Sequence, residues 1–257
     1  MTLSAAGVAL LIAFALRKRN PVWQVLLWLL VAMEAAAIWM TQSRGGLIAG
    51  LLVPGVYVIR KWGAKAVVPA AAVALPILML GGRSGADADA STEQRYEAWA
   101  TGIQMFHDHP VFGVGARNFN LHHWLTAHNS FVLTLAEMGL PGLFLFITLI
   151  YLSFKCLVVG LRTLSKVPGT AAAQVWGMAL LAAMAGIVFQ INTLSFAYHQ
   201  VLWLFFAFIG AWTGAVRHHR PDFVVKMTGS DLAIVFGITL SYAIVVVPVF
   251  LKIKGIT

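Results

Sequence analysis

Apolar segments of membrane-spanning length recur along the whole chain, and they constrain its fold more than any other feature. The chain has 257 residues, of which 60% are hydrophobic and 11% are charged, whereas a soluble domain averages about 25% charged residues. Such a chain has too few polar residues to cover the surface of a water-soluble globule. Most of the segments are long enough, or nearly so, to cross about 30 Å of hydrocarbon. They are residues 3–16, 21–41, 46–59, 66–80, 141–159, 172–190, 199–216 and 232–251.

The sequence therefore predicts an all-α, polytopic transmembrane helical bundle with about eight spans. The first and third segments are the shortest of the set. Prolines inside the segments predict kinks, because a proline removes a helical hydrogen bond and crowds the preceding turn. These prolines are Pro54, Pro69, Pro76 and Pro248.

Lysines and arginines are distributed unequally between alternate connections. One set of connections holds twelve of the 18 and the other set holds six. The positive-inside rule places the first set in the cytoplasm, so that both chain ends face outward. No cleavable signal peptide is evident, because Arg17-Lys18-Arg19 follows the first segment. We expect from this that the chain is the C-terminal part of a longer protein; the alternative is that residues 3–16 do not form a span.

The connection from about residue 81 to 140 is the only long one. It divides the chain into N-terminal transmembrane helices (1–80), an extracytoplasmic catalytic loop (81–140) and C-terminal transmembrane helices (141–257). The loop holds most of the polar chemistry of the chain. Loops longer than about 12–15 residues are usually functional or disordered, and the aromatic residues of this one favour a folded segment that packs on the bundle.

Two short helices are predicted inside this loop. The first begins at Ser91, because Ser91-Thr92-Glu93-Gln94 has the character of an N-terminal cap, and it ends in a turn over 109–115 that is rich in proline and glycine. The second covers about 129–138 and breaks at Gly139, just before the next span. Apolar residues recur along the first helix at three- and four-residue spacing, which predicts one apolar face. They are Tyr96, Trp99, Ile103 and Phe106.

Three motifs follow one another in and beside the loop. The first is Thr41-Gln42-Ser43-Arg44-Gly45-Gly46, at the outer end of the second span. The second is Arg95-Tyr96-Glu97-Ala98-Trp99, which is followed by Asp108-His109-Pro110-Val111-Phe112-Gly113-Val114-Gly115. The third is Ala127-His128-Asn129-Ser130-Phe131, which is followed by Leu135-Ala136-Glu137-Met138-Gly139-Leu140-Pro141-Gly142.

This ordered set resembles the O-antigen ligase and O-antigen polymerase family of membrane glycosyltransferases, over about residues 40–160. The resemblance implies that a glycan is transferred from a polyprenyl-diphosphate carrier to an acceptor hydroxyl. It also implies a site at the periplasmic or outer face of the bacterial cytoplasmic membrane. The acceptor is a lipid such as lipid A core, another glycan repeat unit, or a protein, and the sequence does not choose among them. Family members usually have more helices before the Ser-Arg-Gly element.

Arginines at the outer surface suit a diphosphate leaving group. Arginine stays protonated and binds phosphate oxygens in a bidentate manner, so it stabilises the charge that develops during transfer. We expect Arg44 and Arg95 to bind the diphosphate, and Arg117 to contribute on weaker grounds. The alternatives are that Arg44 anchors a helix end at the membrane surface and that Arg95 pairs with Glu93.

His128 is the candidate catalytic base. Transfer to a hydroxyl requires removal of a proton, and histidine titrates in the useful range. A helix N-terminus and neighbouring arginines would both keep its ring neutral, as a base requires. The alternative is a histidine that only orders the loop. We expect Asn129 to cap the following helix or to orient His128.

Two further polar residues, Glu34 and His199, lie outside the three motifs. Glu34 lies inside the second span, where burying an acidic side chain in the membrane costs free energy. Such a residue is by default a functional candidate, so we assign Glu34 a supporting role without an identified partner. His199, at the outer start of a span, has no assigned role. Metal binding is disfavoured, because the His-x-His and His-His spacings lack a convincing ligand pattern, so we expect no metal and no cofactor. These histidines are His107, His109, His122 and His123.

The composition and charge also bear on other classes of function. The net charge of +9 does not indicate a nucleic-acid partner, because the basic residues form short clusters between apolar segments. A transporter of a lipid-linked anion could use the same arginines, but such proteins tend to show repeated halves, and no internal repeat is evident here. A further alternative is that the chain is a non-catalytic partner of another membrane protein.

Overall fold

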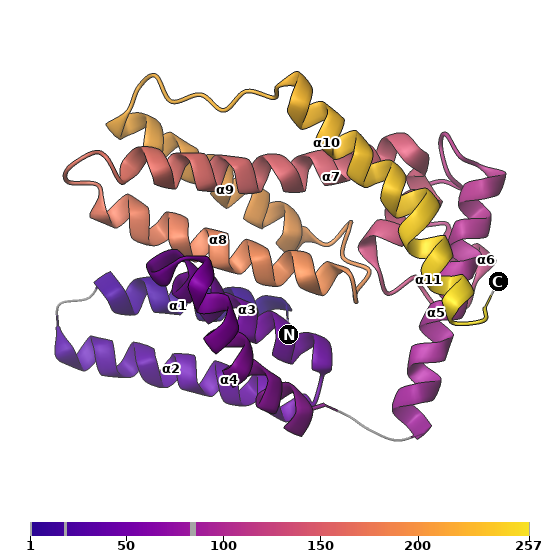
Figure 1. Ribbon diagram of the computed structural model, residues 1–257, viewed down its shortest axis with the longest axis horizontal. Coiled ribbons are helices and arrows are strands. Elements are labelled where there is room, and N and C mark those ends of the chain that lie inside the picture. The colour runs from indigo at the N-terminus through magenta and orange to yellow at the C-terminus, as the bar shows by residue number, and fades with distance from the viewer. Residues whose placement is uncertain (1, 18–19, 83–85, 257) are drawn as a thin grey trace. The chain divides into compact units, whose positions relative to one another are not determined.

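The computed structural model describes residues 2–17, 20–82 and 86–256, so Lys18 and Arg19 of the first basic cluster lie outside it. Across these ranges the protein is helical and contains no strand, which confirms the predicted all-α class (Figure 1). The helices are α1 (Thr2–Arg17), α2 (Pro21–Met40), α3 (Arg44–Trp62), η1 (Ala64–Ala66), α4 (Val67–Leu80), α5 (Ala86–Asp108), α6 (Phe119–His122), α7 (Ser130–Leu164), α8 (Ala171–Ile191), α9 (Gln200–His219), α10 (Gly229–Leu240), η2 (Ser241–Val246) and α11 (Val247–Ile253).

Every apolar segment named from the sequence coincides with a helix. Five helices are long and apolar enough to cross a membrane, namely α2, α7, α8, α9 and the continuous helix Gly229–Ile253. Ala6–Arg17 and Ala64–Leu80 are shorter apolar helices. The protein is therefore a polytopic helical membrane protein, and the count of eight spans stays a prediction.

The chain divides into two compact units, each described by itself. The first unit comprises residues 1–83, 153–190 and 200–225. In it α1 packs against α2 and α3. Trp212 of α9 lies against α7 and α8. A Cβ added at Gly160 of α7 would lie 2.7 Å from its ring, and its indole N–H donates to the carbonyl of Ala173 of α8 at 2.8 Å. A Cβ added at Gly177 would lie 2.4 Å from this indole ring, so glycine permits the close helix packing.

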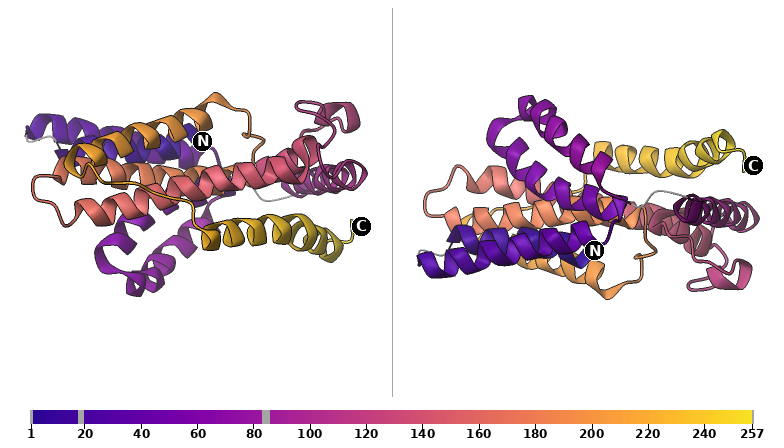
Figure 2. Two further views of the ribbon diagram at one scale, coloured as in Figure 1. Left: turned by 90° about the horizontal axis from the view of Figure 1, so that it is seen from above. Right: turned by 90° about the horizontal axis from the view of Figure 1, so that it is seen from below.

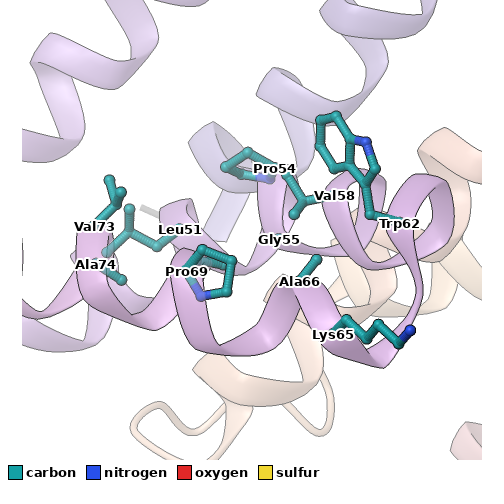
Figure 3. A pocket seen from close by; sticks show the side chains of 11 residues that line it. Leu51, Pro54, Gly55, Val58, Trp62, Lys65, Ala66, Pro69, Val73 and Ala74 are labelled. Carbon is teal, nitrogen blue, oxygen red and sulfur yellow. The ribbon is translucent and has the colours of Figure 1, made fainter.

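A groove lies between α3 and α4 in the first unit (Figure 3). Its volume is about 690 Å³, and its lining is apolar except for Lys65. Pro54 of α3 and Pro69 of α4 lie along it. α3 and α4 continue through the interior prolines Pro54 and Pro76. Among the described residues that line the groove there is no acid, histidine or arginine.

The second unit comprises residues 84–152, 191–199 and 226–257 and holds the loop that the sequence singles out. α7 has a break at Gly139, where φ is 66° and ψ is −167°, which confirms the predicted boundary between a loop helix and a span. Figures 1 and 2 show α10, η2 and α11 as one continuous rod, and α11 packs against α5. Phe250 of α11 meets Tyr96 and Trp99 of α5, with ring centroids 5.1 and 5.7 Å apart.

The start of α5 differs from the prediction. The helix begins at Ala86 and not at Ser91, so Ser91 and Thr92 are interior residues and do not cap it. Alanine has the highest helix propensity of the amino acids, and the Ala-Asp-Ala-Asp-Ala sequence before Ser91 extends the helix toward its N-terminus. The predicted apolar face is present, because Ile103 and Phe106 are buried.

Candidate functional site

His128 stands in a strained segment directly before α7. Its φ is 47°, a left-handed conformation that is uncommon for a residue other than glycine. The residues on either side, Ala127 and Asn129, are 0% and 2% exposed, while His128 itself is half-buried. The indole N–H of Trp99 donates to the carbonyl of Ala127 at 2.7 Å. Contacts with α5 therefore fix the backbone on the N-terminal side of His128.

Asn129 fixes the other side of His128. Its Oδ1 accepts hydrogen bonds from the backbone N–H of Phe131 at 2.9 Å and of Val132 at 3.2 Å. Asn129 is thus the N-cap of α7, the structural role that its sequence position suggests. Its Nδ2 donates to the Tyr242 hydroxyl at 2.9 Å.

The neighbouring Ser130 joins this segment to the loop over 191–199. Its hydroxyl donates to the carbonyl of Leu194 at 2.6 Å and accepts the N–H of Phe196 at 2.7 Å. The side chain of Ser130 is completely buried. Three separate stretches of the second unit therefore hold the histidine segment in place, namely α5, the loop over 191–199 and the helix that carries Tyr242.

The electrostatic surroundings of His128 keep its imidazole neutral. Burial lowers the pKa of His128 below its usual value of 6.5, and the positive charge of Arg95 lowers it further. Arg95 lies half-buried on α5. A neutral imidazole beside a fixed cation is suited to accept a proton from a substrate hydroxyl while the cation attracts an anion. The positive charge of Arg95 thus acts on His128, and that the two side chains serve one site stays a prediction.

Arg117 belongs to the same unit, and its backbone is held by a buried acid. The N–H of Arg117 donates to Glu137 Oε2 at 2.9 Å, and the N–H of Phe119 donates to Glu137 Oε1 at 2.8 Å. Glu137 is 2% exposed. Arg117 has a φ of 66° and an exposed side chain. Burial, and then the Glu137 carboxylate, raise the pKa of the nearby Tyr198 hydroxyl, so it stays protonated.

Sequence reasoning missed Glu137 as a site residue. Its signal was available, because Glu137 is an acid within the apolar stretch 131–147. A buried carboxylate is stable only when its oxygens are hydrogen-bonded or paired. The backbone N–H groups of a loop that lies 18 to 20 residues earlier supply those bonds, and local sequence patterns do not predict such a partner.

The turn after α5 packs directly on the break in α7. The N–H of Gly115 donates to the carbonyl of Glu137 at 3.0 Å, and the N–H of Leu140 donates to the carbonyl of Pro110 at 2.9 Å. A Cβ added at Gly113 would lie 2.3 Å from the carbonyl carbon of Glu137. A Cβ added at Gly139 would lie 2.3 Å from the Val111 oxygen. Only glycine permits so close an approach of the two backbones.

Arg44 and Glu34 belong to the first unit. Arg44 is the first residue of α3, and Ser43 caps that helix by accepting the N–H of Gly46 at 3.2 Å. The Arg44 side chain is exposed and lies against Gly82, whose added Cβ would meet Arg44 Cγ at 2.5 Å. A cation at a helix N-terminus is unfavourable to the helix dipole, so helix stability does not explain this arginine. That Arg44 acts with Arg95 and His128 stays a prediction.

Glu34 of α2 lines a cavity of about 210 Å³ together with Leu11 of α1 and apolar residues of its own helix. The supporting role assigned to it stays a prediction. His199 stacks on Phe196, with ring centroids 4.0 Å apart and planes inclined by 13°. Within the described ranges, no three His, Cys, Asp or Glu side chains are grouped in a way that could hold a metal ion.

The sequence also matches a known protein family. A family model described as O-antigen ligase matches residues 1–147, which is more than half of the chain. The matched region contains all the residues that we assign to the site from the sequence. No curated protein and no solved structure matches the chain.

Proposed function

This chain belongs to the O-antigen ligase family, and from that premise we propose that it transfers a glycan from a polyprenyl-diphosphate carrier to an acceptor hydroxyl. The family uses lipid-linked glycans and acceptors in general, and the long apolar helices agree with a bacterial inner-membrane protein. The observation that carries the proposal is the pair formed by a half-buried histidine in a strained segment and the arginine that acts on its charge.

His128 acts as the general base in this proposal. Its neutral imidazole removes the proton from the acceptor hydroxyl as the acceptor oxygen bonds to the anomeric carbon of the sugar. The bond between that carbon and the diphosphate oxygen breaks, and its electron pair leaves with the polyprenyl diphosphate. The lowered pKa of His128 supports this role, because it favours the unprotonated ring that a base requires.

Arg95 and Arg44 stabilise the diphosphate as its negative charge grows, and Arg117 contributes from the exposed turn after α5. A fixed guanidinium costs no reorganisation at the moment of bond breaking, so one such donor is worth roughly 3 kcal/mol of barrier. Arg95 then has two effects, because it both attracts the leaving group and keeps the base neutral. The proposal needs no metal ion, since the arginines supply the positive charge.

The site faces the periplasm or cell exterior in this proposal. The support is the distribution of basic residues, which makes the connections opposite to this loop cytoplasmic. Nucleotide sugars are absent on that side, so a lipid-linked donor is the available form of activated sugar. The acceptor is a lipid, a growing glycan or a protein, and the chemical nature of the product distinguishes a ligase from a polymerase.

The test uses the membrane-reconstituted protein with a labelled polyprenyl-diphosphate-linked glycan and a mixture of candidate acceptors. His128→Ala, Arg95→Ala and Arg44→Ala should each reduce the transfer rate at least tenfold. Arg162→Ala is the matched control, because Arg162 is an exposed arginine on the opposite set of connections. If all three site variants transfer glycan at the wild-type rate with normal membrane levels, the assignment of the site is wrong.

A further inference from the structure

The C-terminal helix contains a wide turn whose cause lies in the sequence. Residues Ser241–Val246 form a π-helical segment, and the N–H of Val247 bonds to the carbonyl of Tyr242, five residues earlier. Pro248 follows directly. A proline has no N–H and its ring clashes with the carbonyl four residues before it, so the helix widens just ahead of Pro248. π turns of this kind occur frequently at functional sites.

The wide turn changes which residues share a face of the helix. In a regular α-helix Tyr242 and Phe250 would point about 80° apart, because eight residues at 3.6 per turn exceed two turns. A π turn absorbs one extra residue, which leaves the two side chains within about 20° of each other. Phe250 meets the aromatic rings of α5, and Tyr242 meets Asn129. One face of the helix thus contacts one neighbour of His128 directly and the other through Trp99. Phe250 packs on Trp99, which bonds to Ala127, and Tyr242 bonds to Asn129.

The contact between Tyr242 and Asn129 is reciprocal and specific. Asn129 Nδ2 lies 2.9 Å from the Tyr242 hydroxyl, and that hydroxyl lies 3.1 Å from Asn129 Oδ1. The Tyr242 ring also packs on Phe131, with ring centroids 5.3 Å apart. Asn129 is 2% exposed, so these contacts take place out of reach of bulk water.

The Tyr242 hydroxyl anchors the Nδ2 end of the Asn129 side chain. Asn129 Oδ1 must point to the N–H groups of Phe131 and Val132 to cap α7. These two donors select one orientation of the amide, and they leave the buried Nδ2 in need of a hydrogen-bond partner, because an unpaired buried donor is costly. Tyr242 is that partner. Because Asn129 follows His128 directly, loss of this hydrogen bond would loosen the left-handed conformation that orients the imidazole.

We propose that Tyr242 is a positioning residue, which holds His128 in its productive orientation through Asn129. This inference rests on the proposed function and deepens it, since it assigns to the C-terminal helix, outside the region matched by the family, a part in the site. Tyr242 touches no reacting atom in this scheme. Its effect is on the rate of the chemical step and not on the binding of donor.

The first test compares two tyrosine variants in the reconstituted protein. Tyr242→Phe removes only the hydroxyl and keeps the ring against Phe131, and it should lower kcat roughly tenfold while the KM for donor stays unchanged. Tyr151→Phe is the matched control, because the Tyr151 hydroxyl donates to the carboxylate of Asp231 within the same unit. The control should keep wild-type kcat. Equal kcat for both variants would overturn the proposal.

A double-mutant cycle shows whether Tyr242 acts through Asn129. Asn129→Ala should lower kcat at least as much as Tyr242→Phe, and adding Tyr242→Phe to it should produce less than a twofold further loss. Independent, multiplicative losses would contradict the proposed route. The cycle therefore distinguishes a positioning role from a general loss of packing.

A third measurement does not depend on transfer activity. In protein labelled at histidine, the ring resonances of His128 should be single in wild type and in Tyr151→Phe, and broadened or doubled in Tyr242→Phe. Unchanged resonances in Tyr242→Phe would overturn the positioning role even if transfer occurs. Broadened resonances together with an absence of transfer in wild type would support the positioning role and contradict the glycosyltransferase function.

Discussion

The buried carboxylate of Glu137 holds the backbone of Arg117, twenty residues earlier, by accepting its N–H at 2.9 Å. The same carboxylate accepts the N–H of Phe119 at 2.8 Å through its other oxygen. Both oxygens of one acid are thus used to shape the turn that carries an exposed arginine. The Glu137 carboxylate thus has a structural role, and through it determines the position of the Arg117 backbone.

Glu137→Gln tests this relationship. Glutamine keeps one acceptor oxygen but replaces the other by an NH₂ group, which faces a backbone N–H. We expect a loss of about 1–3 kcal/mol in the free energy of unfolding, because a buried donor is left without an acceptor. Thermal unfolding in detergent is the measurement, with Asp222→Asn as the control, since Asp222 is exposed. Equal stability of the two variants would show that the Glu137 contacts contribute little.

The pH dependence of transfer should report His128. A base must be unprotonated, so kcat/KM should rise with pH through the pKa of His128 and level off above it. Burial and Arg95 lower that pKa below 6.5, so the midpoint of the rise should lie below pH 6.5. Initial rates of transfer between pH 4.5 and 8.5 measure this profile, and a midpoint above 7 would contradict the assignment.

Arg95→Gln should move that profile in a defined direction. Removing the positive charge leaves burial as the remaining cause of the lowered pKa, so the midpoint should shift to higher pH. The rate at the plateau should also fall, roughly tenfold or more, because the diphosphate loses a cation. Gln104→Ala, at an exposed position of the same helix, is the control. A lowered plateau with an unshifted midpoint would show that the charge of Arg95 does not influence the pKa of His128.

The packing of the two backbones at Gly139 predicts a strong steric effect. Gly139→Ala places a Cβ 2.3 Å from the Val111 oxygen and in a left-handed conformation, so it should destabilise the second unit by several kcal/mol. Gly210→Ala is the matched control, because an added Cβ at Gly210 in α9 meets no atom within 4 Å. Alanine there should be neutral or stabilising by up to about 1 kcal/mol. Unfolding of the two variants in parallel tests the difference.

The charge of Arg44 and its geometry can be tested separately. Arg44→Lys keeps the charge but loses the planar pair of donors, so we expect it to recover only part of the rate lost in Arg44→Ala. Transfer rates at saturating donor give the comparison. Full activity in both variants would favour the alternative role of Arg44 as a helix anchor at the membrane surface.

Local sequence patterns predicted the features that depend on residues close in the chain. The N-cap at Asn129 and the break at Gly139 follow from asparagine and glycine acting on their own backbone, and both are present. The predicted start of α5 was wrong by five residues. The Ser91-Thr92 pair resembles an N-cap, but the alanines before it favour a helix.

Contacts between distant segments lay beyond such patterns. Trp99 was recognised as part of an apolar face, but its bond to Ala127 spans 28 residues. Tyr242 bonds to Asn129 across 113 residues, and Pro248 predicted only a kink, not the π turn that directs Tyr242. Pairing at these separations is decided by tertiary packing, which no local periodicity encodes.

The most direct test of the central claim is the stoichiometry of the reaction in vesicles that contain only the purified protein, a lipid-linked glycan donor and an acceptor. The proposal predicts that glycan–acceptor product and free polyprenyl diphosphate form in equal amounts, without nucleotide or ion gradient, and that His128→Ala abolishes both. Movement of intact donor across the bilayer with no cleavage of the sugar–phosphate bond would contradict it, and would favour a transporter of lipid-linked anions.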